Sequence, residues 1–290
     1  MVEPAASDTP RKQIALVYDY SAVPILPDIQ HGALTALTGT EWGLTVFAVD
    51  SNGSDLADDF TDFLERQRPA GIILPPPLSE IRLLTRLARQ FGCEPVCLGT
   101  VPQGDTGKFV ASDDRRAVAA TIAWLISLGH ERIGMIAGPE DSRLAQEREL
   151  GYLDAIADHD LDRGPSLIVN GDNTFISGFK SGRLLLEVSP RPTAIFAAND
   201  EMAAGVLQAA ARAKIAVPED LAVVGFEDTA LAARLCPQLT SVRVPLAEMA
   251  QFAALLLIAP QGAENLPSDF SAQLVKRGSA GPCPASTGPA

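Results

Sequence analysis

The chain has 290 residues, of which 47% are hydrophobic and 20% are charged. This balance is typical of a folded globular protein and excludes wholesale disorder, a collagen-like repeat and a coiled coil. Lys and Arg number 23 against 36 Asp and Glu, which gives a net charge of −13. We therefore expect that the chain does not hold nucleic acid by itself, because a surface that grips phosphates is basic.

The four cysteines are too few and too scattered to form a disulfide scaffold, which favours a reducing, cytoplasmic setting. Cys93 and Cys97 lack the spacing of a zinc site, and we interpret them as buried structural thiols. The first residues lack the order of an export signal, and no apolar run approaches the roughly 18 residues that a membrane helix needs. No membrane contact is predicted.

Short apolar runs alternate with stretches of helical period in the first half of the chain, which predicts a parallel sheet covered by helices. The strands are predicted at 13–18, 44–49, 70–74, 95–99 and 108–112, and the helices at 28–39, 55–67 and 79–91. Three consecutive prolines at 75–77 end the third strand, because proline cannot donate to a ladder.

The pattern then restarts. Helices are predicted at 114–128, 144–159, 175–188 and 200–213, and strands at 132–137, 166–169, 193–198 and 221–226. Residues 1–12 and 278–290 are rich in small residues and proline without periodicity, and we predict disordered tails there.

Two tandem series of this kind predict an α/β protein with two doubly wound parallel-sheet lobes. Ligands of such sheets bind beyond the carboxyl ends of the strands, so the functional residues should follow strands. The polar or Gly-containing segments in such positions are 19–24, 75–77, 112–114, 138–143, 170–173, 198–200 and 225–229.

Several kinds of chemistry find no support in the sequence. The chain has no P-loop, no dinucleotide fingerprint after its first strand and no G-x-S-x-G elbow, and its three histidines are isolated. We expect no cofactor and no bound metal. The adjacent acids Asp113-Asp114 and Glu227-Asp228 could form an acid/base pair, or they could cap helices and place charge in a first turn.

Five segments together resemble the effector-binding core of LacI/GalR-type bacterial transcription regulators, which shares the type I fold of periplasmic sugar-binding proteins. They are LISLGHERIGMIAGP (125–139), RELGY (148–152), RPTAIFAANDEMAAG (191–205), VPEDLAVVGFED (217–228) and PQLTSVRVP (237–245). The resemblance extends from Gln13 to about Gly278. It implies a homodimer that binds a small polar effector, without a catalytic residue.

The resemblance implies that Arg148 bonds to hydroxyl or carboxylate oxygens of the effector, since a guanidinium supplies directional donors. The alternative for this arginine is a surface ion pair with Glu147 or Glu149. Asn199 corresponds to the family's amide-bearing contact, which both donates and accepts, and it could also cap the helix at 200–213.

Three further contacts follow from the resemblance. Glu227 stands where these regulators usually carry Asp, and its extra methylene moves the carboxylate further into the pocket, which implies a changed ligand. Asn173 stands where sugar-binding members often place an aromatic. Asp113 matches an acid at the end of the strand that leads into the helix at 114–128.

The segment that follows the first predicted strand departs most from the family. Asp19 keeps the acid that follows the first strand, but Ile25 and Leu26 replace the aromatics of the family's N-P-F-[FY] pattern. Stacking on a purine or a flat sugar face is correspondingly disfavoured. We nevertheless expect Asp19, Ile25 and Leu26 to contact the ligand.

Members of the family begin with a helix-turn-helix headpiece that enters DNA grooves, whereas about a dozen residues precede the first strand here. Either the sequence is truncated or the natural protein senses a ligand without touching DNA. The resemblance places the lobes at 13–129 with 245–262 and at 130–244 with 263–277. The chain is then expected to cross between the lobes near 127–131, 242–246 and 260–268.

We therefore predict an effector-sensing core that binds a carbohydrate or derivative between its lobes and couples lobe closure to DNA binding in the full-length regulator. A sugar-binding protein of a transport or chemosensory system is the second hypothesis. An enzyme that uses crevice carboxylates on the same fold is the third.

Overall fold

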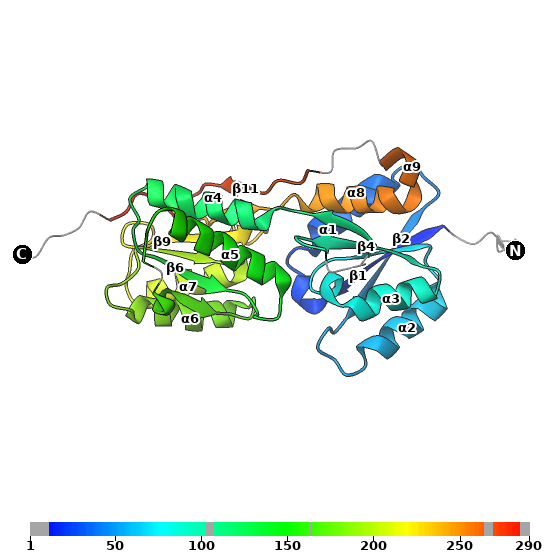
Figure 1. Cartoon of the computed structure of the whole chain (residues 1–290), viewed down its shortest axis with the longest axis horizontal. Helices are drawn as coiled ribbons and strands as arrows, with labels where there is room; N and C mark the ends of the chain where they lie inside the picture. The colour runs from blue at the N-terminus through cyan, green and yellow to red at the C-terminus, as the bar shows by residue number, and fades with distance from the viewer. Residues whose placement is uncertain (1–11, 103–106, 163, 264–268, 285–290) are drawn as a thin grey trace, which may run out of the picture. The chain divides into compact units, whose positions relative to one another are not determined.

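The computed structural model describes residues 12–102, 107–162, 164–263 and 269–284. Contacts divide the chain into unit 1, with residues 1–110 and 246–268, and unit 2, with residues 111–245 and 269–290 (Figure 1). Each unit is an α/β structure built on its own sheet, as the alternation of strands and helices predicts.

Unit 1 contains a five-stranded sheet in the order β2-β1-β3-β4-β5. Its first strand pairs in parallel with β2 and β3, and β3 pairs in parallel with β4. The elements in chain order are β1 (Gln13–Asp19), η1 (Tyr20–Ala22), α1 (Leu26–Leu37), β2 (Gly43–Val49), α2 (Leu56–Gln67), β3 (Gly71–Leu74), η2 (Leu78–Glu80), α3 (Arg82–Gln90), β4 (Glu94–Gly99), β5 (Lys108–Ala111), α8 (Leu246–Ile258) and α9 (Pro260–Ala263).

Helices cover both faces of the unit 1 sheet (Figure 1). On one face α1 packs closely against α8, and a Cβ added to Gly32 would lie 1.9 Å from the carbonyl oxygen of Ala247. On the other face α2 and α3 pack together, and Phe63 of α2 stacks on Phe47 of β2 with ring centroids 4.3 Å apart. The core between these layers is made of the apolar runs that predicted the strands.

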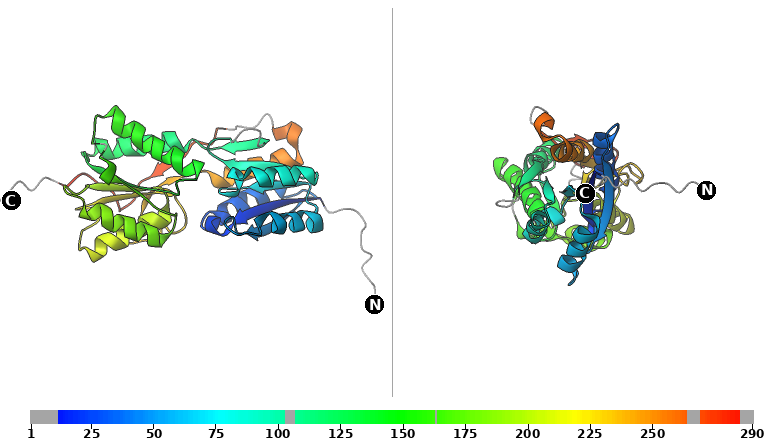
Figure 2. Two further views of the ribbon diagram at one scale, coloured as in Figure 1. Left: turned by 60° about the horizontal axis from the view of Figure 1, so that its bottom comes forward. Right: turned by 90° about the vertical axis from the view of Figure 1, so that its right-hand side faces the viewer.

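Unit 2 contains a six-stranded sheet in the order β11-β10-β9-β8-β6-β7, in which β11 alone is antiparallel to its neighbour. Its elements are α4 (Asp114–Ser127), β6 (Ile133–Ala137), α5 (Arg143–Asp158), η3 (Pro165–Leu167), β7 (Ile168–Asn170), α6 (Phe175–Glu187), β8 (Ala194–Ala197), α7 (Asp200–Arg212), β9 (Ala222–Glu227), β10 (Thr240–Arg243) and β11 (Gln273–Val275). The helices pack as the pairs α4–α5 and α6–α7, which lie on opposite faces of the sheet (Figures 1 and 2).

The boundary between the units differs from the predicted one. Residues 111–129 were expected in the first lobe, but they belong to unit 2, where α4 packs on α5. The physical reason is that the apolar face of α4 meets α5 and also contacts β10 and β11. The chain returns to unit 1 between Pro245 and Leu246, and the described residues from Asp269 onward belong to unit 2 again.

The predicted C-terminal tail also requires a correction. Of the tails, residues 1–11 and 285–290 lie outside the described residues, but 278–284 are ordered against unit 2. The buried hydroxyl of Ser279 donates to the carbonyl of Val223 at 2.6 Å and accepts from the amide of Thr240 at 2.8 Å. Further along, the amide of Cys283 donates to the carbonyl of Leu128 at 2.9 Å. Composition alone did not reveal these hydrogen bonds, because isolated bonds of this kind leave no periodic pattern in the sequence.

Candidate functional site

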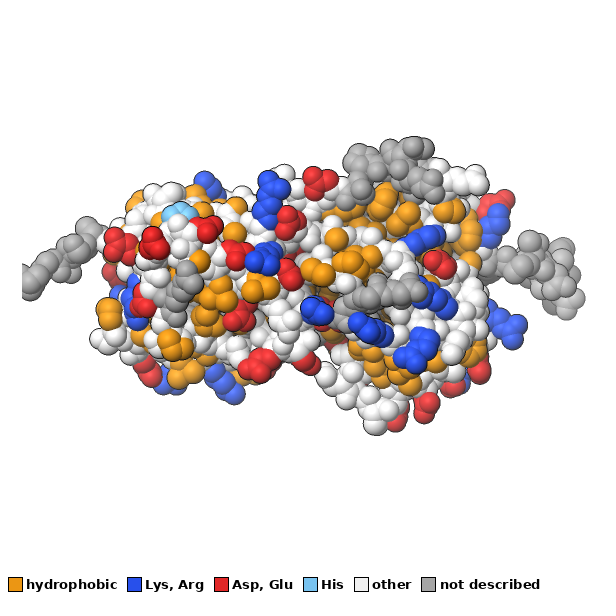
Figure 3. All heavy atoms as spheres, viewed as in Figure 1, with side chains coloured by type: hydrophobic (Ala, Val, Ile, Leu, Met, Phe, Trp, Pro, Cys, Tyr) orange, Lys and Arg blue, Asp and Glu red, His pale blue; other side chains and the backbone are white. Residues whose placement is uncertain are grey.

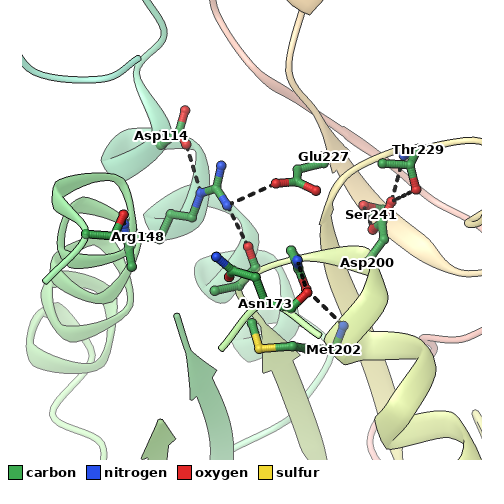
Figure 4. A network of polar contacts seen from close by, with 12 residues as sticks. Asp114, Arg148, Asn173, Asp200, Met202, Glu227, Thr229 and Ser241 are labelled. Atoms are coloured by element: carbon green, nitrogen blue, oxygen red, sulfur yellow. Dashed lines mark hydrogen bonds and ion pairs between the residues drawn. The ribbon is translucent and has the colours of Figure 1, made fainter. Parts of the chain in front are cut away.

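Polar side chains gather at the carboxyl ends of the unit 2 strands (Figure 4). Asn199 follows β8, Glu227 ends β9, Arg148 reaches in from α5, and Asp114 begins α4. Because parallel strands present their carboxyl ends at one edge of a sheet, this is the edge at which α/β proteins bind ligands. We refer to Asp114, Arg148, Asn199 and Glu227 as the strand-end cluster.

Arg148 is the centre of this cluster. Its side chain is buried, and Nε donates to Oδ2 of Asp114 at 2.9 Å. Nη1 donates to the carbonyl oxygen of Ala198 at 2.7 Å and lies 3.5 Å from Oε1 of Glu227. The guanidinium carbon lies 4.0 Å from the centroid of the Phe226 ring. The suggested surface ion pair with Glu147 or Glu149 is therefore wrong, since Arg148 points into the protein.

The residues that follow Arg148 explain why α5 holds it there. A Cβ on Gly151 would lie 2.2 Å from the carbonyl oxygen of Arg115, so only glycine permits this close approach of α5 to α4. The buried hydroxyl of Tyr152 donates to the carbonyl of Ile133 at 2.8 Å and ties α5 to β6. The R-x-x-G-Y spacing thus positions one arginine between two helices and the sheet.

The two adjacent acids that begin α4 have different environments. Asp113 is exposed, and Oδ1 caps the helix by accepting from the amide of Arg116 at 3.2 Å. Asp114 is 1% exposed, accepts from the hydroxyl of Ser112 at 2.6 Å, and pairs with Arg148. The structure therefore brings Asp114 into the cluster, whereas Asp113, the predicted contact, serves as a cap.

The side chain of Asn199 is engaged at both ends. Oδ1 accepts from the amide of Met202 at 2.9 Å and so caps α7, while Nδ2 donates to the carbonyl of Asn173 at 2.9 Å. Asn173 has a φ of 66°, a left-handed conformation that asparagine tolerates better than most residues. The structure thus links these two predicted residues directly, and the proposed capping role of Asn199 is confirmed.

Glu227 has a strained backbone. Its φ is 99° and that of Asp228 is 53°, although neither residue is glycine. Such conformations cost about 1–3 kcal/mol each and persist where surrounding contacts enforce them. Here Asp228 provides those contacts, because its carboxylate binds Arg243 at 2.7 Å and Arg277 at 2.5 Å, and its amide donates to Ser241 at 3.1 Å.

Asp200 supports the same turn; it lies in the strand-following segment 198–200 but is not among the expected ligand contacts. It is buried, its Oδ2 accepts from the amide of Thr229 at 2.6 Å, and its Oδ1 accepts from the hydroxyl of Ser241 at 2.5 Å. Burial raises the pKa of Asp200 to about 6, although these hydrogen bonds oppose the change. The available signal was its place after Asn199, where an acid favours the first turn of α7.

The carboxyl group of Glu227 is only partly compensated. Burial raises its pKa to about 7, and the nearby carboxylates of Asp200 and Asp114 act in the same direction, while Arg148 opposes them. The side chain nevertheless keeps 15% of its surface exposed. Among the described residues, its side-chain polar contact is the 3.5 Å approach to Arg148. This carboxyl group is therefore the more weakly paired of the two acids beside Arg148.

The other three predicted contacts belong to unit 1. Asp19 is buried and accepts from the amides of Ser21 and Ser51, both at 2.7 Å. Burial works against its charged form, but these bonds and that of the Ser21 hydroxyl outweigh it and lower the pKa of Asp19. Ile25 and Leu26 are half-buried where α1 begins. Asp19 thus ties together the segments that follow β1 and β2.

Basic side chains gather elsewhere, over α3 of unit 1, on the face shown in Figure 3. This helix exposes Arg82, Arg86 and Arg89.

Within the described ranges, no three His, Cys, Asp or Glu side chains are placed to hold a metal ion. No helix in the same ranges is long and apolar enough to span a bilayer. Cys93 and Cys97 are buried free thiols, as predicted.

A family model for the periplasmic binding protein-like domain matches residues 122–280, which is more than half of the chain. The chain belongs to this family. Its core is of the LacI type, which confirms the predicted resemblance. The HTH-type transcriptional regulator AscG of Escherichia coli K12 is 37% identical over 169 residues, which are 58% of this chain and 50% of that protein. The ribose operon repressor of the same strain is 41% identical over 135 residues, 47% of this chain and 41% of that repressor.

A solved structure extends the similarity to both units. The transcriptional regulator CelR–cellobiose complex matches with a TM-score of 0.83 and 28% identity, over 93% of this chain and 84% of that chain. The periplasmic binding protein-like fold predicted from the sequence is therefore confirmed. In sequence, however, the chain spans about half the length of the curated relatives it matches.

Proposed function

We propose that this LacI-type core senses a small polar effector, a carbohydrate or carbohydrate derivative, and that the strand-end cluster binds it. The observation that carries this proposal is the buried Arg148, which is held at the carboxyl edge of the sheet beside the partly exposed Glu227. A guanidinium that donates and a carboxylate that accepts suit ligand hydroxyls, which do both. The strained turn at Glu227 favours a ligand-binding role as well.

The similar proteins support the chemical class of this effector. CelR is similar over both units and is described as a cellobiose complex, and another relative is the ribose operon repressor. Both names point to carbohydrates. Binding without turnover is the proposed activity, since the similar proteins are transcriptional regulators.

The proposal also includes what the core does in a cell. Where the core is joined to a helix-turn-helix headpiece, effector binding would shift its equilibrium between conformations and so change the affinity for DNA. We further propose that the protein acts as a homodimer in the cytoplasm. These partners are expected from the LacI type of the core.

The experiment is a thermal-shift screen of the purified chain with neutral sugars, sugar acids, amino sugars, polyols and nucleobases. A ligand that binds only the native state raises the melting temperature. We expect a selective rise with a carbohydrate, and we expect Arg148→Ala to weaken that ligand by about 1.5–3 kcal/mol. Because Arg148→Ala also disturbs a buried ion pair, its fold is checked by circular dichroism. No rise with any carbohydrate would contradict the proposed effector class.

A further inference from the structure

The charges around Arg148 do not balance. Two carboxylates, those of Asp114 and Glu227, share its one guanidinium, at 2.9 Å and 3.5 Å (Figure 4). Asp114 is the tighter partner, and the hydroxyl of Ser112 also donates to it at 2.6 Å. The positive charge of Arg148 is thus largely neutralised inside the protein, so little of it remains to attract an anionic ligand.

The other charged groups nearby do not offset this excess of negative charge. Asp200 is buried, and its hydrogen bonds come from the neutral groups of Thr229 and Ser241. Asp228 lies beside Glu227 in the chain, but its own charge is matched by Arg243 and Arg277. When all these acids are ionised, the region therefore carries more negative than positive charge.

Of these acids, Glu227 is the one that a ligand can reach, since Asp114, Asp200 and Asp228 are each only 1% exposed. Its contact with Arg148 is the longer one, its side chain is 15% exposed, and it points toward Arg148 (Figure 4). A ligand group that meets the ionised Glu227 must either donate a hydrogen bond, as a neutral hydroxyl does, or bring a positive charge. An ammonium group does the second, and a partly desolvated site strengthens this attraction relative to water.

We propose that the effector is a hydroxyl-rich molecule that carries a cationic amino group, which binds the carboxylate of Glu227, and that the site discriminates against anionic sugars. This inference rests on the proposed function of the strand-end cluster. It assigns distinct roles, in which Glu227 selects the charge of the ligand and Arg148 and Asn199 bind neutral oxygens.

The preference for a cationic ligand should also make the binding affinity depend on pH. The groups that face Glu227 are Arg148 of α5, Asp114 of α4 and Asp200 of α7, with Asp228 next to it in the turn. Burial raises the pKa of Glu227 to about 7. Since an ammonium group prefers the ionised carboxylate, affinity should rise by about tenfold between roughly pH 5.5 and pH 7.

The test uses matched probes on three scaffolds: glucose, galactose and mannose, each as the neutral sugar, the 2-amino sugar and the uronate. Binding to the full chain is measured by thermal shift and calorimetry at pH 7 and pH 5.5. We expect an amino sugar to bind at least tenfold more tightly than its neutral counterpart, and the uronate to bind most weakly. Glu227→Gln should remove the preference, whereas Glu219→Gln, a change at an exposed acid of unit 2, should keep it.

The outcomes separate the two proposals. A neutral sugar or a uronate that binds as tightly as the matched amino sugar overturns the inference but leaves the sensing function intact. If no probe of any charge binds, the proposed function fails and the inference fails with it. If Glu227→Gln does not fold, the pH dependence of the wild type decides, since affinity for the amino sugar that stays constant or falls as the pH rises contradicts the role of Glu227.

Discussion

Nε of Arg148 donates to Oδ2 of Asp114 at 2.9 Å, and both side chains are almost fully buried. A buried ion pair of this kind joins α4 to α5, and removal of one partner leaves the other charge poorly compensated. The pair therefore fixes the orientation of the arginine before any ligand arrives.

Asp114→Asn should lower the free energy of unfolding by about 3 kcal/mol, because Arg148 loses its closer carboxylate. Urea denaturation at neutral pH provides the measurement. The matched control is Asp113→Asn, which keeps a good helix cap and should change stability by less than about 0.5 kcal/mol. Equal losses from the two variants would contradict the assignment of Asp114 rather than Asp113 to the cluster.

Asn199 caps α7 and also bonds to the carbonyl of Asn173. Asn199→Ala removes both interactions and should cost about 1–3 kcal/mol. Asn199→Asp keeps the capping oxygen but loses the amide donor, so we expect a smaller loss in the same denaturation experiment. If Asp proved as damaging as Ala, the bond to Asn173 would account for the whole effect and the cap for none of it.

The raised pKa of Glu227, about 7, makes stability depend on pH. Between about pH 4.5 and 7 the folded state holds more protons than the unfolded state, so this group contributes stability at low pH that is lost as the pH rises. Glu227→Gln resembles the protonated form. The variant should therefore match the wild type near pH 4 and exceed it near pH 8 in melting temperature, while Glu219→Gln follows the wild type throughout.

The cysteines should differ in reactivity. Burial raises the pKa of Cys93 and of Cys97 to about 12, whereas Cys236 is exposed. Since the thiolate is the reactive form, a thiol reagent at pH 8 should label Cys236 rapidly and leave Cys93 and Cys97 unlabelled until denaturant is added. Mass spectrometry of peptides identifies the labelled residues, and Cys236→Ser should abolish the rapid phase at this position. Rapid native labelling of Cys93 would contradict its burial.

Ser279→Ala should destabilise unit 2 by about 1–3 kcal/mol, because the amide of Thr240 and the carbonyl of Val223 both lose a buried partner. Thermal unfolding followed by circular dichroism measures the change. Ser271→Ala affects an exposed hydroxyl that donates to the side chain of Asp269, and it should be nearly neutral. A neutral Ser279→Ala variant would show that residues 278–284 add little to the fold.

The order of strands and helices could be predicted because apolar runs and helical periodicity are local properties of the sequence. The partner of a helix is not a local property. The apolar face of α4 could cover either sheet, so nothing local in the sequence opposed the family resemblance, which placed residues 111–129 in the first lobe. Similarly, β10 was missed, since its four residues include Thr240 and Ser241, whose hydroxyls serve the buried network rather than solvent.

Part of the candidate site could also be predicted from the sequence. The family resemblance selected Arg148, Asn173, Asn199 and Glu227, of which the last three also lie in segments that follow strands. The contacts Asn199–Asn173 and Arg148–Glu227 join them in pairs in unit 2. The choice between two adjacent acids depends on helical phase, which separates neighbours by about 100°. The motif could not fix that phase, so Asp113 was selected where Asp114 faces Arg148.

The chain leaves unit 1 after β5 and returns to it only with α8, after the main part of unit 2. At roughly 5–20 residues per second, a ribosome needs about 7 to 27 seconds to make the intervening segment, residues 111–245. During that time α1 lacks the helix that packs closely at Gly32, and β3 and β4 lack the helix that covers one of their faces. A nascent chain that pauses before Leu246 is therefore expected to expose an aggregation-prone apolar surface. It should depend on chaperones until translation passes Ile258.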